Sequence, residues 1–385
     1  MQRRAFVVVI DACGVGELPD AAQYGDTGAN TLLHVAQAVG GLELPNLGAL
    51  GLGNILALPG VPPARAPALH GRLAPLGPGK DSSAGHWELM GVVVASAPPS
   101  YPHGLPPPLR ARVEETIASP VICNRHYNGI AAIEDYGIEH LAGGRPILYT
   151  SADSVIQLAA HTSVLDAERL YAMCAALRGA LQGPQAVRRV IARPFEGVPG
   201  AFERTAGRRD YTLAPPSPSQ LELLRSAGVP VHGVGKAPSL FAEVGFSAVH
   251  PGATNGEAIE SVERLIGELD RGFVFVNLIE TDQVYGHRKD SAGFHEALQA
   301  IDAALGRWLG ILGEEDLLIV TADHGCDPAA PHSDHTREYA PVLAHFTGHG
   351  GRRHDGPLAD VGASVLDWLT AGEAQLPGRS FIAHA

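Results

Sequence analysis

Six acidic and histidine side chains follow apolar runs that are typical of buried strands, most of them closely, with His287 five residues after Asp282 and His335 eleven residues after His324. They are Asp11, Asp282, His287, Asp323, His324 and His335. Asp11 directly follows VVVI, and Asp323 and His324 follow DLLIVTA. The set contains no cysteine. Carboxylates and imidazoles in these numbers suit a pair of Mn²⁺ or Zn²⁺ ions better than a structural zinc ion, which favours cysteine.

Each of these residues taken alone is weak support for a metal site. A single Asp after a strand usually makes a turn or caps a helix. With 18 histidines in the chain, some proximity to acids is expected by chance. The adjacent pair Asp323 and His324 is more specific, because both side chains must face polar space just where apolar burial ends. The six residues together therefore indicate a two-metal site.

The stretch GKDSSAGHWE at residues 79–88 carries a lysine, an acid, two hydroxyls and a histidine. It is not a nucleotide P-loop, because Ala74 replaces the first glycine and Asp81 follows Lys80 where Ser or Thr is required. Two divalent ions about 3.5–4 Å apart clamp a phosphoryl group and activate an oxygen nucleophile. A serine of this stretch would be that nucleophile, and Lys80 would offset phosphate charge. The alternative is a polar turn before a helix.

Apolar runs rich in β-branched residues predict strands that are buried on both faces. The runs are residues 5–10, 146–150, 189–195, 229–235, 272–279 and 316–322. Apolar residues at steps of three and four predict a helix over 294–312, and weaker patterns predict helices over 256–270 and 357–370. The alternation predicts an α/β fold, with a mostly parallel central sheet and helices on both faces. Ligands of such sheets gather at the carboxyl ends of the strands, where the six residues are placed.

Two proline-rich tracts, at residues 96–108 and 214–219, predict hinges, because proline stiffens the chain and removes backbone donors. The segment between them carries its own strands and a predicted helix over 166–182. We therefore expect residues 1–96 and 215–385 to form a metal-binding catalytic core. Residues 97–214 are expected to form an inserted α+β cap domain that binds substrate.

The composition limits the classes of partner. The 385-residue chain has a formal net charge of −13, which argues against a nucleic-acid binder or an anionic-membrane binder. Its four cysteines are scattered without a CxxC pair, which favours reduced thiols and a cytoplasmic protein. The apolar run near the N-terminus spans six residues and ends at Asp11, too short for a signal peptide or a membrane span.

Motifs spread along nearly the whole chain are similar to those of one enzyme family. They are DACGVGELPDAAQYGDTGANTLLH, GKDSSAGHWELMG, YTSADSVIQLAAH, VIARPFEGVPGAFERTAGRRDYTL, GVGKAPSLF, NLIETDQVYGHRKD and TADHGCDPAAPHSDHTREYAP. The chain resembles the phosphopentomutases, the prokaryotic metal-dependent type within the alkaline phosphatase superfamily. Asp-His pairs occur across that superfamily, whereas the tracts around 149–161 and 190–212 are more specific. The resemblance implies an alkaline-phosphatase-like core with an inserted cap.

The resemblance also implies roles for individual residues. The nucleophile would be Ser82, the hydroxyl residue directly after the Lys-Asp pair. One metal ion would be held by Asp11, Asp323 and His324 together with the Ser82 oxygen. The other ion would be held by Asp282, His287 and His335. Ala84 stands where the family commonly has a second hydroxyl, which favours Ser82 as the acceptor.

Substrate contacts are implied in the same way. Asp153 and Ser154 resemble residues that meet the sugar hydroxyls. Arg193, Arg204 and Arg208 resemble residues around the distal phosphate, which suits the planar guanidinium fork, and Lys236 would approach from the core. Ile130 stands where threonine is usual, so no contact is assigned to the tract 123–137.

The implied reaction interconverts (deoxy)ribose 1-phosphate and (deoxy)ribose 5-phosphate through a phosphoserine, with two Mn²⁺ ions and a sugar bisphosphate as primer. Zn²⁺ or another divalent ion could replace Mn²⁺. One alternative is a metal-dependent phosphomonoesterase or another phosphosugar mutase of the superfamily. A second is a catalytically silent metal-binding or sensor protein, against which the complete ligand set argues.

Overall fold

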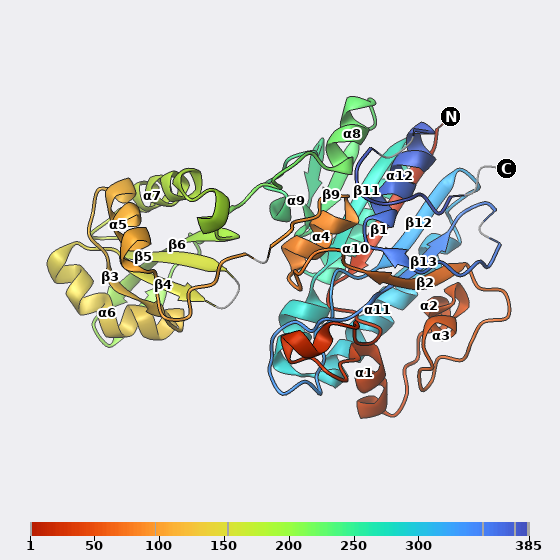
Figure 1. Cartoon of the computed structure of the whole chain (residues 1–385), viewed down its shortest axis with the longest axis horizontal. Coiled ribbons are helices and arrows are strands. Elements are labelled where there is room, and N and C mark those ends of the chain that lie inside the picture. The colour runs from red at the N-terminus through yellow and green to blue at the C-terminus, as the bar shows by residue number, and fades with distance from the viewer. Residues whose placement is uncertain (1, 97, 152–153, 349, 373–374, 383–385) are drawn as a thin grey trace. The chain divides into compact units, whose positions relative to one another are not determined.

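The chain, described by a computed structural model over residues 2–96, 98–151, 154–348, 350–372 and 375–382, forms two compact units (Figure 1). The first unit is Met1–Ser96 with Pro215–Ala385, and the second is Ala97–Ala214. Each has its own sheet. Among the described residues, no helix combines the length and hydropathy needed to cross a bilayer.

An eight-stranded sheet forms the centre of the first unit, in the order β10-β9-β11-β1-β12-β13-β2-β14. The strands are β1 (Arg4–Ile10), β2 (Leu69–Ala74), β9 (Val231–Val234), β10 (Ala248–His250), β11 (Gly272–Leu278), β12 (Asp316–Thr321), β13 (Ala340–His345) and β14 (Gly356–Pro357). From β10 to β12, neighbouring strands run parallel. Every residue of β1 after Arg4 is buried, as expected for a central strand covered on both faces.

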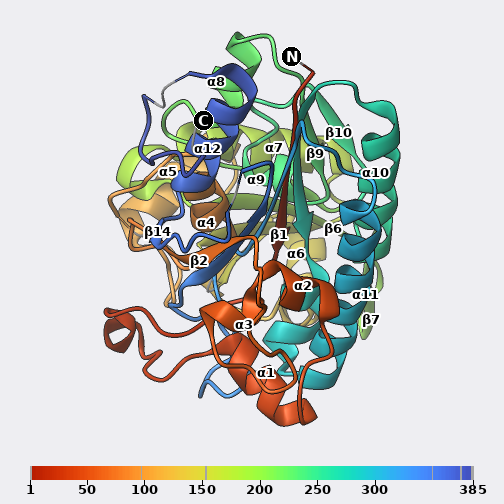
Figure 2. The ribbon, with the colours of Figure 1, turned by 90° about the vertical axis from the view of Figure 1, so that its right-hand side faces the viewer.

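Helices cover both faces of this sheet (Figure 2). On one face α12 (Asp360–Thr370) packs against β1, β11 and β12. On the other, α10 (Asn255–Glu268) packs against β11 and β9, with α11 (Ser291–Leu309) beside it. These three helices confirm the predicted helical patterns, and the arrangement confirms the predicted α/β class. Further helices of this unit are α1 (Thr31–Val39), α2 (Pro45–Leu50), α3 (Leu52–Ile55), α4 (Ser82–Leu89), α8 (Gln220–Ser226) and α9 (Ala237–Leu240).

Two strands that the sequence patterns did not predict, β13 and β2, extend this sheet beyond β12. β13 runs antiparallel to β12, and β2 runs antiparallel to β13. Pro341 lies within β13 and Gly71 within β2, and both residue types are depleted in strands. The Thr321 hydroxyl donates to the Pro341 carbonyl at 2.8 Å and helps to join β12 to β13. Tertiary pairing therefore outweighs local propensity here.

A six-stranded mixed sheet forms the centre of the second unit. The strands are β3 (Ile122–His126), β4 (Ile147–Ser151), β5 (Val155–His161), β6 (Arg189–Val198), β7 (Ala201–Arg204) and β8 (Arg209–Thr212). β4 runs antiparallel to β5, and β6 runs antiparallel to β7 and β8. The runs at 146–150 and 189–195 are strands of this second sheet, each with one parallel neighbour and at least one antiparallel neighbour, so they do not belong to the mostly parallel central sheet. An apolar run shows that a strand is buried, not which sheet it joins or in which direction its neighbours run.

Three helices cover this second sheet. α5 (Pro107–Ile117) and α7 (Ala167–Ala180) pack on one face around a core of Leu148, Leu158 and Val190. α6 (Gly129–Gly143) packs on the other face. The predicted helix over 166–182 is α7. The first proline tract ends inside α5, because Pro107 occupies the first helical position, where its missing N–H is not needed.

Candidate active site

Three neighbouring parallel strands bring the acidic residues of the first unit together. β1 lies between β11 and β12, with Ile10 paired with Leu278 and Val9 paired with Thr321. Asp11 follows β1, Asp282 follows β11 within a short π-helical segment (Thr281–Tyr285), and Asp323 follows β12. Because the carboxyl ends of parallel strands meet at one edge of a sheet, the three carboxylates converge there.

The first group of potential ligands is Asp11, Asp323 and His324, whose donor atoms all lie within 4.8 Å of one another. The His324 Nε2 atom lies 3.4 Å from Asp11 Oδ1 and 3.3 Å from Asp323 Oδ2. The Ser82 hydroxyl oxygen lies 3.2 Å from the same nitrogen. All four side chains are buried. The predicted nucleophile therefore adjoins the first predicted ligand set.

The second group surrounds Asp282. Its Oδ1 atom lies 3.2 Å from His335 Nε2 and 3.5 Å from His287 Nε2. The His335 ring stacks on that of His324 with centroids 3.8 Å apart, which joins the two groups. The donor atoms of Asp282, His324 and His335 form a second cluster within 4.8 Å. The structure thus brings together all six residues predicted as metal ligands.

Two histidines have the tautomer that metal binding requires. His324 Nδ1 lies 3.2 Å from the Gly325 carbonyl oxygen, and His287 Nδ1 lies 2.6 Å from the Ser333 carbonyl oxygen. A carbonyl only accepts, so each Nδ1 carries the hydrogen and leaves an Nε2 lone pair facing the carboxylates. Burial lowers the pKa of His324 to about 4, which keeps its ring neutral near pH 7. A neutral imidazole is the form that binds a metal ion.

The crowding of buried carboxylates favours a cation at this position. Burial and the nearby Asp323 and Asp282 raise the pKa of Asp11 well above its usual range. Asp11 Oδ1, Asp282 Oδ1 and Asp323 Oδ2 are buried, and histidine nitrogens lie 3.1–3.5 Å from them. Neutral imidazoles do not balance the charge of buried carboxylates, and buried charge is costly unless it is paired or binds a metal. These residues therefore fit divalent ions.

Ser82 opens a buried helix. It is the first residue of α4, whose N-cap Asp81 accepts a hydrogen bond from Ala84 N at 3.1 Å. Gly85 allows this helix to approach the Asp323 turn, because a Cβ there would lie within 3.0 Å of Asp323 backbone and side-chain atoms. The partial positive charge of a helix N-terminus favours a negatively charged group at the Ser82 oxygen.

The two predicted lysines are placed differently. Lys80 Nζ lies 2.9 Å from the buried carboxylate of Asp26, which also accepts from His332 Nε2 at 2.8 Å. Lys80 thus anchors its loop in this structure, and its contact with a phosphate stays a prediction. Lys236, half-buried after β9, is near enough to Asp11 for its charge to oppose the rise in that carboxyl's pKa.

The second unit gathers the three predicted arginines around one tyrosine. Arg193 Nε donates to the Gln157 side-chain oxygen at 3.0 Å, and the Tyr149 hydroxyl donates to the same oxygen at 3.1 Å. Burial raises the pKa of Tyr149, whereas Arg204, Arg193 and Arg208 oppose the rise. Arg208 makes a two-pronged ion pair with Asp210, at 2.6 and 2.7 Å. This cluster has the charge and the donors to bind an anion.

Asp153 and Ser154 are the residues of the second unit that were predicted to contact the sugar hydroxyls. Asp153 lies outside the described residues. Ser154 is buried with a positive φ of 56°, and its hydroxyl donates to the Pro99 carbonyl at 2.6 Å. Ser154 is therefore engaged with backbone in this structure, and its contact with a sugar hydroxyl stays a prediction.

Comparison with known proteins identifies the family. The family model of the metalloenzyme superfamily matches residues 3–372. The chain is 48% identical to the phosphopentomutase of Anaeromyxobacter dehalogenans strain 2CP-1, over 100% of this chain and 99% of that relative. It is 46% identical to the phosphopentomutase of Dictyoglomus turgidum, over 99% and 97% of the two chains. The chain belongs to the phosphopentomutase family.

Members of the phosphopentomutase family are isomerases, so this protein is an isomerase that uses divalent metal. The solved PH0037 protein from Pyrococcus horikoshii has a similar fold, with a TM-score of 0.50 and 14% identity over 97% of this chain and 98% of that one. The predicted alkaline-phosphatase-like core is thereby confirmed.

Two residues behind the ligands were not assigned from the sequence. Asn277 Nδ2 donates to Asp11 Oδ2 at 2.9 Å and lies 3.1 Å from His86 Nε2. His86 Nδ1 lies 2.9 Å from the Ser82 carbonyl oxygen and 3.1 Å from Asp323 Oδ2. His86 stood in a conspicuous motif, and Asn277 was the polar residue inside the apolar run FVFVNLI. These polar partners hold the carboxylates in their orientation.

We expect Asn277→Leu to lower the affinity for Mn²⁺ by about 10- to 100-fold, the usual effect of losing a partner of a metal ligand. Titration with Mn²⁺ would measure it. Asn54→Leu is the matched control, because it removes two hydrogen bonds to Ala64 in a loop that contributes no ligand. Equal Mn²⁺ affinities for the two variants would contradict a supporting role for Asn277.

A thiol lies beside the second ligand group. The Cys326 sulfur lies within 4.8 Å of donor atoms of Asp282 and His287, and it donates to the Asp334 carbonyl at 3.8 Å. Burial, followed by the nearby carboxylates, raises the pKa of this thiol.

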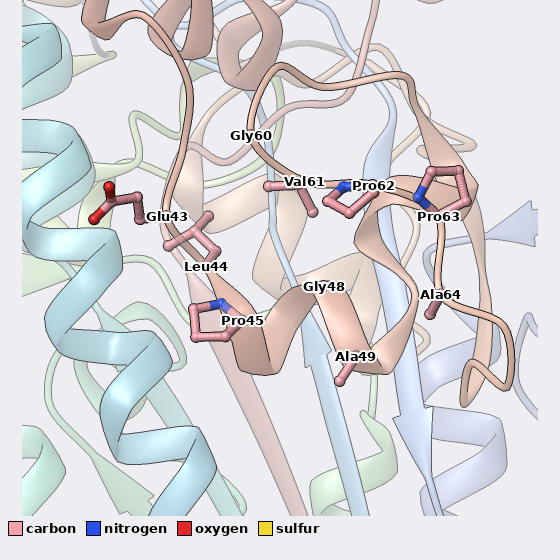
Figure 3. Close-up of a pocket in the computed structure, with 10 residues that line it drawn as sticks. All are labelled: Glu43, Leu44, Pro45, Gly48, Ala49, Gly60, Val61, Pro62, Pro63 and Ala64. Atoms are coloured by element: carbon pink, nitrogen blue, oxygen red, sulfur yellow. The ribbon is translucent and has the colours of Figure 1, made fainter.

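A separate pocket of the first unit lacks groups suited to this chemistry. It has a volume of about 420 Å³ beside α2 (Figure 3). Leu44, Pro45, Val61 and Pro62 line it, and the carboxylate of Glu43 points away from these side chains. It contains none of the six ligands, so the candidate active site stays at the edge of the sheet.

Proposed function

We propose that this protein is a phosphopentomutase that interconverts (deoxy)ribose 1-phosphate and (deoxy)ribose 5-phosphate in the cytoplasm. The observation that carries the proposal is the position of Ser82. Its hydroxyl lies at the start of α4, 3.2 Å from His324, within a cluster of three carboxylates and three imidazoles. Relatives with the printed name phosphopentomutase match the chain over its full length.

The ligand groups suit two divalent ions, for which we propose Mn²⁺, with Zn²⁺ as an alternative. Asp11, Asp323 and His324 would hold one ion, and Asp282, His287 and His335 the other. When bound, such ions withdraw charge from phosphate oxygens and make a nearby hydroxyl a better nucleophile. Carboxylate and imidazole ligands are compatible with both metals.

Ser82 performs the transfer in this proposal. Phosphorylated Ser82 donates its phosphoryl group to the free hydroxyl of the pentose monophosphate: the Ser82 O–P bond breaks as the new O–P bond forms. The resulting 1,5-bisphosphate then returns the phosphoryl group at its other end to Ser82. A sugar bisphosphate primes the enzyme by the same step. Asp81 caps the helix that begins at Ser82, and the partial positive charge of that N-terminus favours a phosphoryl group on the serine.

The second unit binds the phosphate that is not reacting, which makes residues 97–214 a substrate-binding cap in this proposal. Arg193, Arg204 and Arg208 supply charged donors there. Guanidinium groups suit this role because they pair with two phosphate oxygens at once. Lys236 adds a positive charge near Asp11 in the first unit.

A two-way assay tests this function. With Mn²⁺ and a bisphosphate primer, we expect the 1-phosphate and the 5-phosphate of ribose or deoxyribose each to yield the other, with little free phosphate released. In the proposed mechanism, phosphorylated Ser82 transfers its phosphoryl group to the sugar, so little of it is transferred to water. Rapid release of phosphate without interconversion would instead support a metal-dependent phosphomonoesterase. Neither activity in a metal-loaded protein would support a sensor.

A further inference from the structure

One face of the sheet in the second unit changes from apolar to polar along its length. Side chains alternate between faces along a strand, and the register pairs Tyr149 with Gln157 and Phe195 with Arg204. The face beneath α6 therefore shares the apolar residues Ile147, Ala159, Phe195 and Phe202. The same face continues into Gln157, Arg193 and Arg204. The side chains of Gln157, Arg193 and Arg204 therefore adjoin a packed apolar core.

Gln157 holds the guanidinium group of Arg193. Its buried amide oxygen accepts from Arg193 Nε at 3.0 Å and from the Tyr149 hydroxyl at 3.1 Å. An amide oxygen has two lone pairs, so both are used. Nε is the bonded atom, and among the described residues no hydrogen bond engages the two Nη atoms of Arg193, so their four N–H groups can meet an anion.

Gly129 holds space for the guanidinium group of Arg204. It is the first residue of α6, directly after the N-cap Asn128. A Cβ at Gly129 would lie within 3.0 Å of Arg204 Nη2 and of the Tyr149 hydroxyl oxygen, closer than real Cβ atoms pack. Gly129 has no positive φ, so the backbone does not require glycine there. The absent side chain is what lets Arg204 lie against the helix.

The arrangement concentrates like charge. None of the ion pairs among the described residues involves Arg193 or Arg204, whereas Arg208 is paired with Asp210. Burial and then the neighbouring Arg208 lower the pKa of Arg193. Guanidinium groups held this close repel one another until an anion joins them. The surrounding frame must therefore hold them in place beforehand.

We propose that Gly129, Tyr149 and Gln157 are positioning residues that hold Arg193 and Arg204 ready for the non-reacting phosphate of the substrate. The inference rests on the proposed function, because it assumes a pentose phosphate as ligand. Ready-made geometry raises affinity by removing the cost of ordering long side chains on binding.

The central test is Gly129→Ala. The added methyl group displaces Arg204, and a hydrogen bond to a charged group corresponds to about a ten- to hundredfold change in affinity. We expect KM for ribose 5-phosphate to rise by about that factor while kcat changes little. Loss of binding shared by ground state and transition state raises KM alone, whereas a partly misfolded population would lower kcat instead.

Gly179→Ala is the matched control. It lies in α7 of the same unit, and a Cβ there meets nothing within 4 Å. We expect it to leave KM and kcat unchanged. Gln157→Leu, which removes the shared acceptor, should also raise KM. If both Gly129→Ala and Gln157→Leu keep the KM of the unmodified protein, the inference is overturned while the proposed function stands.

A second readout does not depend on turnover. We expect inorganic phosphate to slow the modification of Arg193 and Arg204 by an arginine-selective dicarbonyl, as mapped by peptide mass. Protection should survive in Gly179→Ala and be lost in Gly129→Ala. Equal protection in both variants would also overturn the inference. If the protein shows this protection pattern but does not interconvert pentose phosphates, the proposed function is refuted. The positioning roles of Gly129, Tyr149 and Gln157 would still stand.

Discussion

Replacing Ser82 by alanine is expected to abolish interconversion of pentose phosphates, with a loss of at least about 10³-fold, because Ser82 is the phosphoryl acceptor in the proposed mechanism. The fold and most of the metal content should survive. Alanine fits the first position of α4, and all the predicted carboxylate and imidazole ligands remain, although the Ser82 oxygen predicted for the first ion is lost. Mutase assays and metal analysis would measure both.

The neighbouring serine provides a matched control. Ser83 is buried in the same helix, and Ser83→Ala should retain much of the activity. Incubation with a sugar bisphosphate followed by peptide mapping should place the phosphoryl group on Ser82. Phosphate found on Ser83, or full activity of Ser82→Ala, would refute Ser82 as the acceptor.

Replacing Asp323 by alanine is expected to lower the affinity for divalent metal by more than about 100-fold, beyond the effect of removing a partner such as Asn277. Asp323 is one of three potential ligands in the first group, and the remaining Asp11 and His324 would not neutralise the ion alone. Activity should fall with metal occupancy. Mn²⁺ titration and assays at increasing Mn²⁺ would test this.

Thermal unfolding gives a second measure of the same change. Metal at about a hundredfold excess over Kd stabilises a folded protein by about 2.7 kcal/mol, so a chelator should lower the Tm of the unmodified protein and hardly change that of Asp323→Ala.

The matched control is Asp302→Ala. Asp302 is also buried, but it accepts from Leu47 N and Asn46 N at the start of α2. It should lose stability yet keep its metal response. Full activity after verified metal removal would refute a catalytic metal centre.

Much of the metal centre could be predicted from residue order. One carboxylate after an apolar run is weak support for a site, because it usually makes a turn or caps a helix, but several such carboxylates after parallel strands support one another. This is why Asp11, Asp282 and Asp323 were expected at one edge. Their convergence follows from a general property of parallel sheets, whose strands all end on the same side. The α/β class followed from the same alternation of strands and helices.

The partners of these residues were decided by tertiary structure. Asn277 looks like an interruption of an apolar strand, and only the pairing of β11 with β1 places its amide beside Asp11. Lys80 was expected to face a phosphate, but folding places Asp26, 54 residues away in sequence, 2.9 Å from its ammonium group. Such contacts depend on which distant segments pack together, which residue types do not specify.

The second unit shows the same division. The resemblance to phosphopentomutases predicted the arginines of its motifs as anion ligands, a role that suits a permanently charged, planar guanidinium fork. The proline tracts led us to expect separate strands within residues 97–214, but the mixed directions of β4, β6 and their neighbours were not predictable from apolar runs, which look alike in either kind of sheet. Nor could the sequence alone show why position 129 is glycine. The reason is the space that Arg204 and Tyr149 occupy, and that space exists only once β4, β7 and α6 have packed together.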